Sequence, residues 1–305
     1  MEFFKQTSID FMAKRYIAAW FSLVMVIVCL SSIWVYKIPL GLDFTGGVQV
    51  EMSFSNSVDM SGIRTKLKNS TLLEDAKIQN IGSSKELLLR ASANNTDAVN
   101  QITAALDQLF PDMTITRKAF IGPQVGDAMY QSSLLALLIA SALTLVYITL
   151  RFEWRFAVSA ILALIHDPIL ILGIFSFFQI EFDLIGLAAL LTVFGYSLND
   201  TIVVYDRVRE NFRKHKDISV YSGLNDSINQ TLSRTIMTSG LTLAVVIVLL
   251  LFGGDTLFAF SVALIIGILI GTYSSIYVAG AFSMLIGLKR EHLISTRQRA
   301  TGPVV

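Results

Sequence analysis

The chain has 305 residues, of which 53% are hydrophobic and 15% are charged, and its mean hydropathy is +0.62. Soluble domains usually carry about 25% charged residues, so one soluble core cannot hide this much apolar surface and lipid must solvate part of the chain. The net charge of +1 implies no nucleic-acid partner. A single cysteine, Cys29, excludes a disulfide within the chain.

Six apolar segments are each long enough to cross a bilayer as a helix of about 20 residues. The first follows Lys14 and Arg15. It is longer than the roughly 7–15 residues of a signal-peptide core and lacks a cleavage pattern, so we predict a retained transmembrane helix. The six predicted helices cover residues 16–36, 129–150, 157–178, 184–204, 233–252 and 257–287.

The remaining segments complete the predicted organisation. An N-terminal segment, residues 1–15, precedes the first helix, and a polar domain, residues 37–126, follows it. The other helices form a five-helix region, residues 127–288, with a loop at 205–232 and a tail at 289–305. The loop mixes basic and apolar residues, so we expect it to lie along the anionic inner leaflet.

Basic residues in the short loops set the predicted orientation. Loops rich in Lys and Arg stay in the cytoplasm, whereas the opposite short loop carries Glu181 and Asp183. Both termini are therefore predicted to be cytoplasmic and domain 37–126 to be periplasmic, in a multi-pass protein of the cytoplasmic (inner) membrane. The basic residues on the cytoplasmic side are Lys5, Lys14, Arg15, Arg151, Arg155, Arg207, Arg209, Arg213, Lys214, Lys216, Lys289, Arg290, Arg297 and Arg299.

The polar domain has an α+β pattern. Strands are predicted at 48–54, 76–81, 86–90 and 113–121, with helices at 58–68 and after Asn95 or Thr96. This β-α-β-β-α-β order is typical of a ferredoxin-like domain, a fold that by itself names no function.

Glycine-rich turns flank this domain where the chain leaves and re-enters the membrane. They are interpreted as tight turns and close packing sites, because glycine permits both. A functional role for Asp43 within the first turn stays open. The glycines are Gly41, Gly46, Gly47, Gly122 and Gly126.

Ionisable residues inside apolar spans are costly and usually face a bundle interior or a water path. Three stand out: Asp167 in the third span, Asp200 in the fourth and Arg234 at the start of the fifth. Asp200 lies about 9 Å from the cytoplasmic end of its span, at about 1.5 Å per residue. Arg234 lies within the first turns of the next span, so we expect both at one depth, where opposite charges favour pairing.

Two interpretations of the Asp200–Arg234 pair remain open. In one, a static ion pair locks two helices together; in the other, protonation of Asp200 releases Arg234 and ionisation recaptures it. His166 is interpreted as a packing residue rather than a relay, and Pro168 can free a backbone carbonyl beside it. Other polar residues expected nearby are Ser197, Asn199, Thr201, Gln230, Ser233, Thr235 and Thr238.

Small residues recur at every fourth position of the last span. Such a ridge lets helix backbones approach closely, either within the chain or against a partner. Its members are Gly267, Gly271, Ser275, Ala279, Ser283 and Gly287.

Several chemistries are excluded by missing motifs. The sequence holds no Gly-Lys dipeptide for a Walker A loop, no His-Glu-x-x-His zinc site and no Gly-x-Ser-x-Gly elbow. Its three histidines, at 166, 215 and 292, form no metal-ligand pattern. We therefore expect no catalytic residues, no metal and no bound cofactor.

Motifs in the membrane region resemble the SecF family. The stretch from Gly195 to Asn211, GYSLNDTIVVYDRVREN, resembles the fourth-helix signature of that family. Further matches occur in family order across nearly the whole chain. They are 41–47, 121–126, 151–156 (RFEWRF), 166–167, 229–235 (NQTLSRT), 251–254 and 271–278 (GTYSSIYV).

This resemblance implies a role and partners. SecF proteins pair with SecD in the RND superfamily of proton-coupled transporters, and act with the SecYEG translocon, with YajC and YidC as further candidates. The pair assists late export of preproteins by pulling them or preventing backsliding, with protons as the coupling ion. The family's proton-coupling residues correspond to Asp200, Arg234 and Asp167. Half of the RND-type bundle is then expected from SecD, and membrane lipids from the bilayer.

Three other functions are weighed. An RND-type exporter of small molecules or lipids usually has a much larger outer domain than these roughly 90 residues. A passive translocon scaffold would not need Asp200. An intramembrane aspartyl protease needs two facing aspartates, but Asp167 and Asp200 are expected at different depths, and Arg234 fits poorly.

Overall fold

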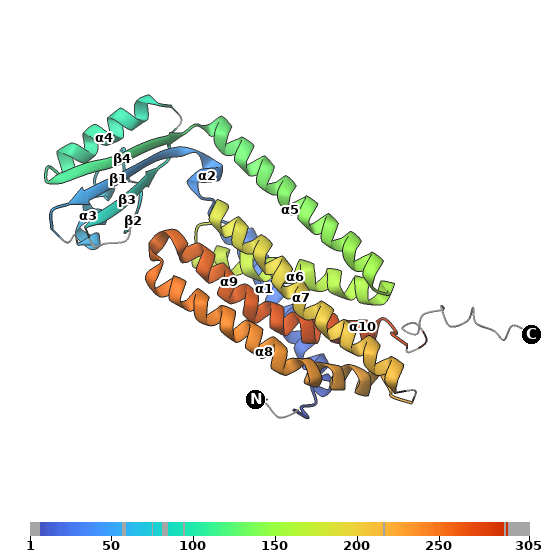
Figure 1. The fold of residues 1–305 in the computed structure, drawn as a ribbon. Coiled ribbons are helices and arrows are strands. Elements are labelled where there is room, and N and C mark those ends of the chain that lie inside the picture. The colour runs from blue at the N-terminus through green and yellow to red at the C-terminus, as the bar shows by residue number, and fades with distance from the viewer. Residues whose placement is uncertain are drawn as a thin grey trace, which may run out of the picture.

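The computed structural model describes residues 7–56, 59–74, 76–80, 85–93, 95–215, 217–289 and 291. These residues form a helical bundle and a small α+β domain at one end of it (Figure 1). The domain is joined to the bundle by the ends of two helices, α1 and α5, and by the α6–α7 connection that lies against it.

Within the described residues, six helices are long and apolar enough to cross a membrane, as predicted. The first is α1 (Arg15–Tyr36), preceded by a 3-10 turn at Met12–Lys14. The others are α5 (Pro123–Arg151), α6 (Trp154–Phe178), α7 (Leu184–Lys214), α8 (Val220–Phe252) and α9 (Gly254–Ser274). After α9 the chain continues through a π-helical turn, Ser275–Gly280, into α10 (Ala281–Leu285).

The segment 205–232, expected to be a loop, is mostly helical. Helix α7 continues to Lys214 and α8 already begins at Val220, with Ser219 accepting a hydrogen bond from Ser222 as the cap. The polar residues of this stretch alternate with apolar ones at helical spacing, so both helices continue beyond their apolar spans. Those apolar side chains pack in one buried cluster, whose members from this stretch are Tyr205, Val208, Phe212, Leu224 and Ile228.

The described N-terminal segment is tied to α8. The Ile9 amide donates to Asn229 Oδ1 at 2.9 Å, and the Phe11 amide donates to Asn225 Oδ1 at 2.9 Å. The side-chain amides of both asparagines donate back to the Ile9 carbonyl. This segment therefore connects the N-terminal part of α8 to the start of α1.

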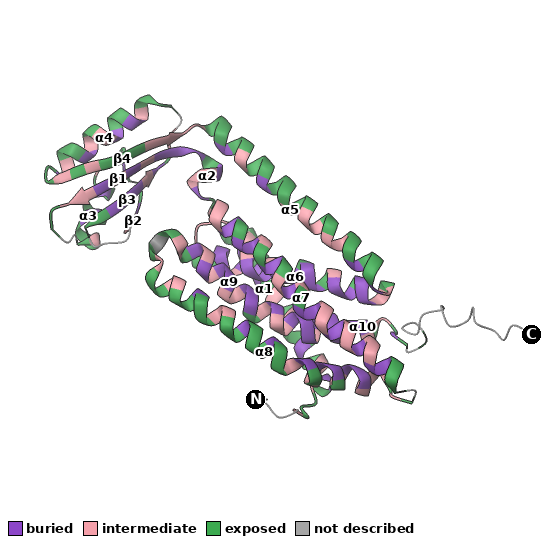
Figure 2. Ribbon diagram, in the orientation of Figure 1, coloured by how far each residue is buried: buried purple, intermediate pink, exposed green. Residues whose placement is uncertain are grey.

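Helices α6, α7 and α9 form the centre of the bundle, whereas α5 and α8 are mostly exposed (Figure 2). Helix α1 lies against α6 so closely that Cys29, which is buried, contacts Gly173. The small-residue ridge packs within the chain: Gly267 faces Val193 of α7, and a Cβ at Gly271 would lie 3.0 Å from Ser197 Cβ. Ser275, Ala279 and Ser283 are also buried, but Gly287 is exposed beyond α10 with a φ of +78°.

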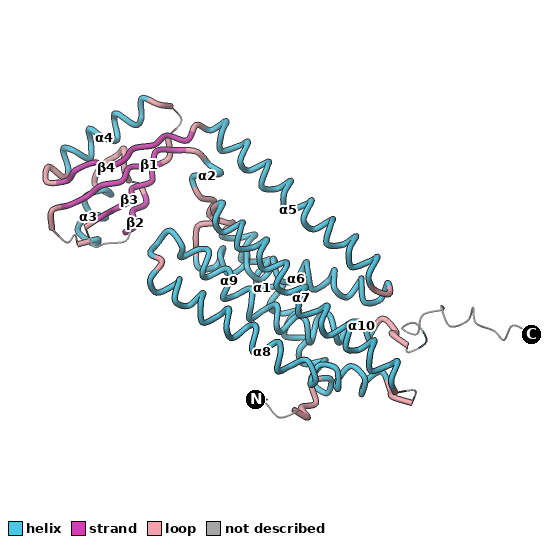
Figure 3. The backbone as a smooth tube through the Cα atoms, viewed as in Figure 1, coloured by secondary structure: helices cyan, strands magenta, loops and turns pink. Residues whose placement is uncertain are grey.

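The α+β domain has the element order that the sequence predicts (Figure 3). Its elements are β1 (Gly47–Phe54), α3 (Met60–Lys68), β2 (Lys77–Asn80), β3 (Glu86–Ala91), α4 (Asp97–Leu109) and β4 (Met113–Ile121). The strands pair antiparallel in the order β2-β3-β1-β4. Alternate residues of β1, such as Val48 and Val50, share one core with Ile63 of α3 and Ile102 of α4, so both helices cover the same face.

The glycine turns form the junction between domain and bundle. After the short helix α2 (Leu42–Thr45), Gly46 and Gly47 adopt φ values of +71° and +142°, which favour glycine. A Cβ on Gly126 would lie 2.9 Å from the Gly46 amide nitrogen, and one on Gly41 would lie 2.9 Å from Asp183 Cβ. Backbone conformation and close packing account for these four glycines.

Replacing Gly47 with alanine should destabilise this junction. The new Cβ would lie 2.6 Å from the Ala91 carbonyl oxygen at a strained φ, so we expect a loss of about 1–3 kcal/mol in the free energy of unfolding. Thermal unfolding of the detergent-solubilised protein measures this. Gly122→Ala is the matched control, because its φ is −64° and its nearest contact is an ordinary 3.7 Å. Equal unfolding midpoints for both variants would contradict the assignment.

Candidate functional site

A buried carboxylate, Asp167 on α6, joins the three central helices. Asp167 is buried, with a relative exposure of only 1%. Its Oδ1 lies 2.9 Å from His166 Nδ1, while Oδ2 accepts hydrogen bonds from Ser197 Oγ of α7 at 2.6 Å and Ser274 Oγ of α9 at 2.9 Å. An acid in an apolar interior needs such partners, because no bulk water is available to solvate it.

Ser274 was not predicted as a site residue. It lies at the last position of α9, directly before the π-helical turn, and π turns inside helices are frequent at functional sites. A lone serine in an apolar helix carries little signal by itself. The family-like stretch 271–278 contains Ser274 together with Tyr273, whose hydroxyl donates to the Ala18 carbonyl at 2.7 Å.

Asp200 lies one helical turn from this network. It is three residues beyond Ser197 on α7, about 4.5 Å along the axis, and is only 2% exposed. Its Oδ2 is buried and has no hydrogen-bond partner in the described part of the chain. Asp167 and Asp200 are therefore closer in depth than predicted, although Ser197 and Ser274, rather than a second aspartate, contact Asp167.

Arg234 of α8 lies at the level of Asp200. The Tyr196 hydroxyl donates to Ser239 Oγ at 3.2 Å, which sets the register of the antiparallel helices α7 and α8. Asp200 is four residues from Tyr196, and Arg234 is five residues from Ser239, toward the same end of the bundle. The predicted common depth of Asp200 and Arg234 is consistent with this register.

The static ion pair between these two residues is not observed. Arg234 is exposed on the outer face of α8, whereas Asp200 faces the bundle interior with Oδ2 unpartnered. Among the described residues, the Asp200 carboxylate makes no ion pair with the Arg234 guanidinium. Equal depth therefore places the two residues in one layer of the bundle without a direct ion pair between them in the described part of the chain.

The supporting polar residues divide between interior and surface. Ser197 and His166 belong to the Asp167 network, and His166 Nε2 is buried without a partner in the described part of the chain. Thr235 is buried at 5% exposure. Asn199 is exposed, since consecutive residues point about 100° apart around a helix and its neighbour Asp200 points inward.

Asp43 has a local structural role at the junction. Its Oδ2 accepts a hydrogen bond from the Leu184 amide at the start of α7, at 3.2 Å. Asp183 caps the same helix by accepting from the Gly186 amide at 2.7 Å. Burial raises the pKa of Asp183, the Gly186 hydrogen bond lowers it, and the nearby Asp43 carboxylate raises it. The start of α7 is therefore held to the first glycine turn.

The chain is similar to known proteins over nearly its whole length. The family described as "Protein export membrane protein SecD/SecF, C-terminal" matches residues 101–289, and the SecD/SecF GG motif matches residues 31–58, which include Gly46 and Gly47. The protein translocase subunit SecF of Pseudomonas aeruginosa is 41% identical over 296 residues, covering 96% of each chain. The chain belongs to the SecF family. The SecF subunit of Vibrio alginolyticus is 43% identical over 97% of this chain and 96% of that one.

A solved structure shows the same fold. SecDF from Thermus thermophilus, described as a translocon-associated membrane protein, superposes with a TM-score of 0.81 at 32% identity over 92% of this chain. The match covers 39% of the SecDF chain, so this protein spans about two fifths of that length. Together with the six apolar helices, the SecF family assignment makes this a multi-pass inner-membrane protein.

Removing the Ser274 hydroxyl should loosen the central helices. Ser274→Ala leaves Asp167 Oδ2 with one donor instead of two, and interhelical hydrogen bonds in membranes are worth about 0.6–1.7 kcal/mol. We expect a loss of that size in unfolding free energy, measured in detergent micelles. Ser261→Ala on the same helix is the control, since the buried Ser261 hydroxyl lacks a partner among the described residues. A loss at Ser261 as large as at Ser274 would contradict this account.

Proposed function

We propose that this chain is the SecF-type half of a complex that uses protons to assist protein export. Its relatives over nearly the whole chain are protein translocase subunits, which favours export of proteins over the alternative of small-molecule export. SecDF carries both halves in one chain, and this protein matches 39% of it. A separate SecD-type partner would supply the other half.

The exposed faces of α5 and α8 suit such a partner. Large apolar side chains cover both helices, for example Leu143 at 66% and Leu241 at 72% exposure. A groove of about 490 Å³ also runs between the start of α5 and the start of α7. Arg234 lies on the same exposed face of α8, so a SecD helix packed there would cover it and complete its surroundings.

The proposed orientation places both termini in the cytoplasm and the α+β domain in the periplasm. Arg151 ends α5, and Arg209 and Lys214 lie in the last turns of α7. These helix ends point away from the domain (Figure 1), as expected for the cytoplasmic side. The domain would then meet preproteins as they leave the SecYEG channel, with YajC and YidC as further candidate partners.

Asp200 carries the proposed coupling. It is a buried acid whose Oδ2 has no hydrogen-bond donor among the described residues, one turn from the Asp167 network and level with Arg234. An unsatisfied buried carboxylate is costly when ionised, so gaining or losing a proton would change which helix arrangement is favoured. The coupling needs no bond-forming chemistry and no cofactor besides protons, so the chain would not be an enzyme.

The available energy is sufficient for a conformational step. One proton crossing a potential of about 150 mV gains roughly 3.5 kcal/mol. That shifts a two-state equilibrium by a few hundredfold. Helices α1 and α5 lead directly into the α+β domain, so a shift of the bundle would move the domain that holds or releases the translocating chain.

Neutralising either charged residue should abolish gradient-dependent export. Asp200→Asn cannot exchange a proton, and Arg234→Met removes the positive charge that lies level with Asp200. We expect both variants to insert normally but to lose stimulation by a proton gradient, measured as preprotein release from inverted vesicles containing the SecD partner.

The matched control is Glu210→Gln, an acid on the same helix that is paired with Arg207 and Lys214 near the C-terminal end of α7. It should retain full gradient dependence. Unchanged gradient dependence in Asp200→Asn would favour the passive-scaffold alternative and overturn the coupling proposal.

A further inference from the structure

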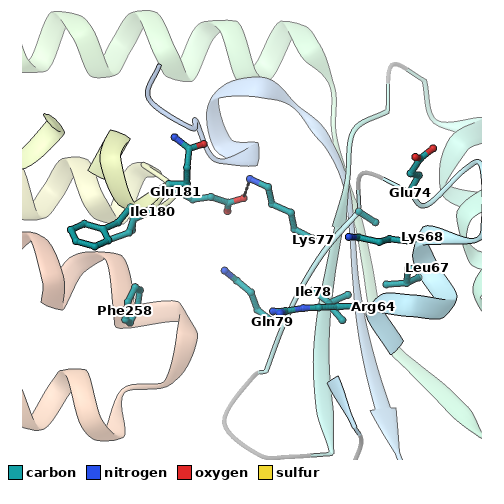
Figure 4. Close-up of a pocket in the computed structure, with 13 residues that line it drawn as sticks. Arg64, Leu67, Lys68, Glu74, Lys77, Ile78, Gln79, Ile180, Glu181 and Phe258 are labelled. Carbon is teal, nitrogen blue, oxygen red and sulfur yellow. Dashed lines mark hydrogen bonds and ion pairs between the residues drawn. The ribbon is translucent and has the colours of Figure 1, made fainter. Parts of the chain in front are cut away.

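A cleft of about 680 Å³ separates the α+β domain from the helix ends below it. Figure 4 shows side chains from both parts pointing into this space. One wall comes from α3 and β2, and the other from the α6–α7 connection and the start of α9. Its lining residues include Arg64, Lys68, Lys77, Gln79, Phe178 and Phe258.

The domain wall of the cleft is basic. Arg64 and Lys68 lie one turn apart on α3, both exposed, and neither makes an ion pair with a described residue. Of the two acids in the cleft, Glu181 has one oxygen held by Lys77 at 2.6 Å and the other by Arg90 at 2.9 Å. The Glu74 carboxylate points away from Lys77 (Figure 4). The cleft therefore presents Arg64 and Lys68 as cations without an ion pair among the described residues, and its lining cations outnumber its acids.

The opposite wall is apolar and lies at the edge of the membrane-spanning helices. Phe178 is the last residue of α6 and is 67% exposed, and Phe258, near the start of α9, is 44% exposed. Helix ends of this kind mark the boundary of the hydrocarbon core, beyond which lipid headgroups begin. The exposed rings of Phe178 and Phe258 give this wall an apolar surface at that boundary.

We propose that this cleft binds the phosphate of an anionic phospholipid from the leaflet on the domain side. Arg64 and Lys68 would contact the phosphate oxygens, and the Gln79 amide can donate a further hydrogen bond. Phe178 and Phe258 would cover the glycerol end of the lipid. The ligand is a membrane lipid rather than a soluble anion, because the phosphate site continues into a surface that already faces hydrocarbon.

Amine labelling of the full chain in nanodiscs tests this site. In phosphatidylglycerol nanodiscs, Lys68 should react severalfold more slowly with a soluble amine reagent than in phosphatidylcholine nanodiscs, as followed by peptide mass spectrometry. Lys66 is the internal control on the same helix, because it lies outside the cleft and contacts Phe110 instead. Equal protection of Lys66 and Lys68 would overturn the proposal.

Variants make the test specific. Arg64→Gln should weaken the lipid contact about fivefold and remove most of the protection at Lys68. Arg117→Gln removes the same charge from β4, which forms the opposite edge of the sheet from β2, and should leave protection intact. If both variants lowered the protection of Lys68 equally, the protection would reflect the overall surface charge, and the proposed site would be rejected.

A last experiment separates lipid from free anion and changes the apolar wall of the cleft instead of the α3 residues. Phe258→Gln should lower protection by phosphatidylglycerol, since it removes the apolar cover. Inorganic phosphate added at millimolar concentration to phosphatidylcholine nanodiscs should protect Lys68 poorly. Protection by free phosphate that matches phosphatidylglycerol, or displacement of the lipid by an acidic peptide, would overturn the lipid proposal.

Discussion

The bundle depends on satisfying one carboxylate in a medium without water. Asp167 brings α6, α7 and α9 together, because Ser197 and Ser274 must both reach the same oxygen. They reach it only because Gly271 lets α9 approach α7 at Ser197, which places Ser274 one turn further along. The small-residue ridge and the polar network therefore depend on each other, because close packing of the helix backbones makes the buried hydrogen bonds possible.

This arrangement connects the membrane interior to the α+β domain. Helix α7 contains both Ser197 and Asp200, and its first residue, Leu184, is bonded to Asp43 in the glycine turn that leads into β1. Glu181, just before α7, binds Lys77 and Arg90 of the domain. A displacement of α7 would therefore reach the domain through the Asp43 hydrogen bond and the ion pairs of Glu181.

Much of the fold could be predicted from the sequence because its elements have strong local signals. The six spans follow from long apolar runs, and the strands follow from alternation such as Val48 and Val50. The extension of α7 and α8 was missed because polar residues beyond the hydrocarbon edge look like a loop, although Val208 and Leu224 keep helical spacing.

The site was predictable in composition more than in geometry. Charge within an apolar run identifies Asp167, Asp200 and Arg234, and span direction gives a common depth for the last two. The direction in which a side chain faces depends on helix rotation, which tertiary packing sets. Packing therefore explains why Arg234 is exposed while Asp200 is buried. For the same reason, the hydrogen bond from Ser274 to Asp167 could be identified only from the structure.

The close approach of α1 to α6 has a practical consequence. The single thiol of the chain, Cys29, is 4% exposed and lies against Gly173. Thiol reactivity requires access to the sulfur, so maleimide and spin-label reagents should not modify Cys29. Cysteines introduced one at a time into the α+β domain or α8 would then be modified selectively in the otherwise native chain, which allows its movements to be followed by spectroscopy without first removing Cys29.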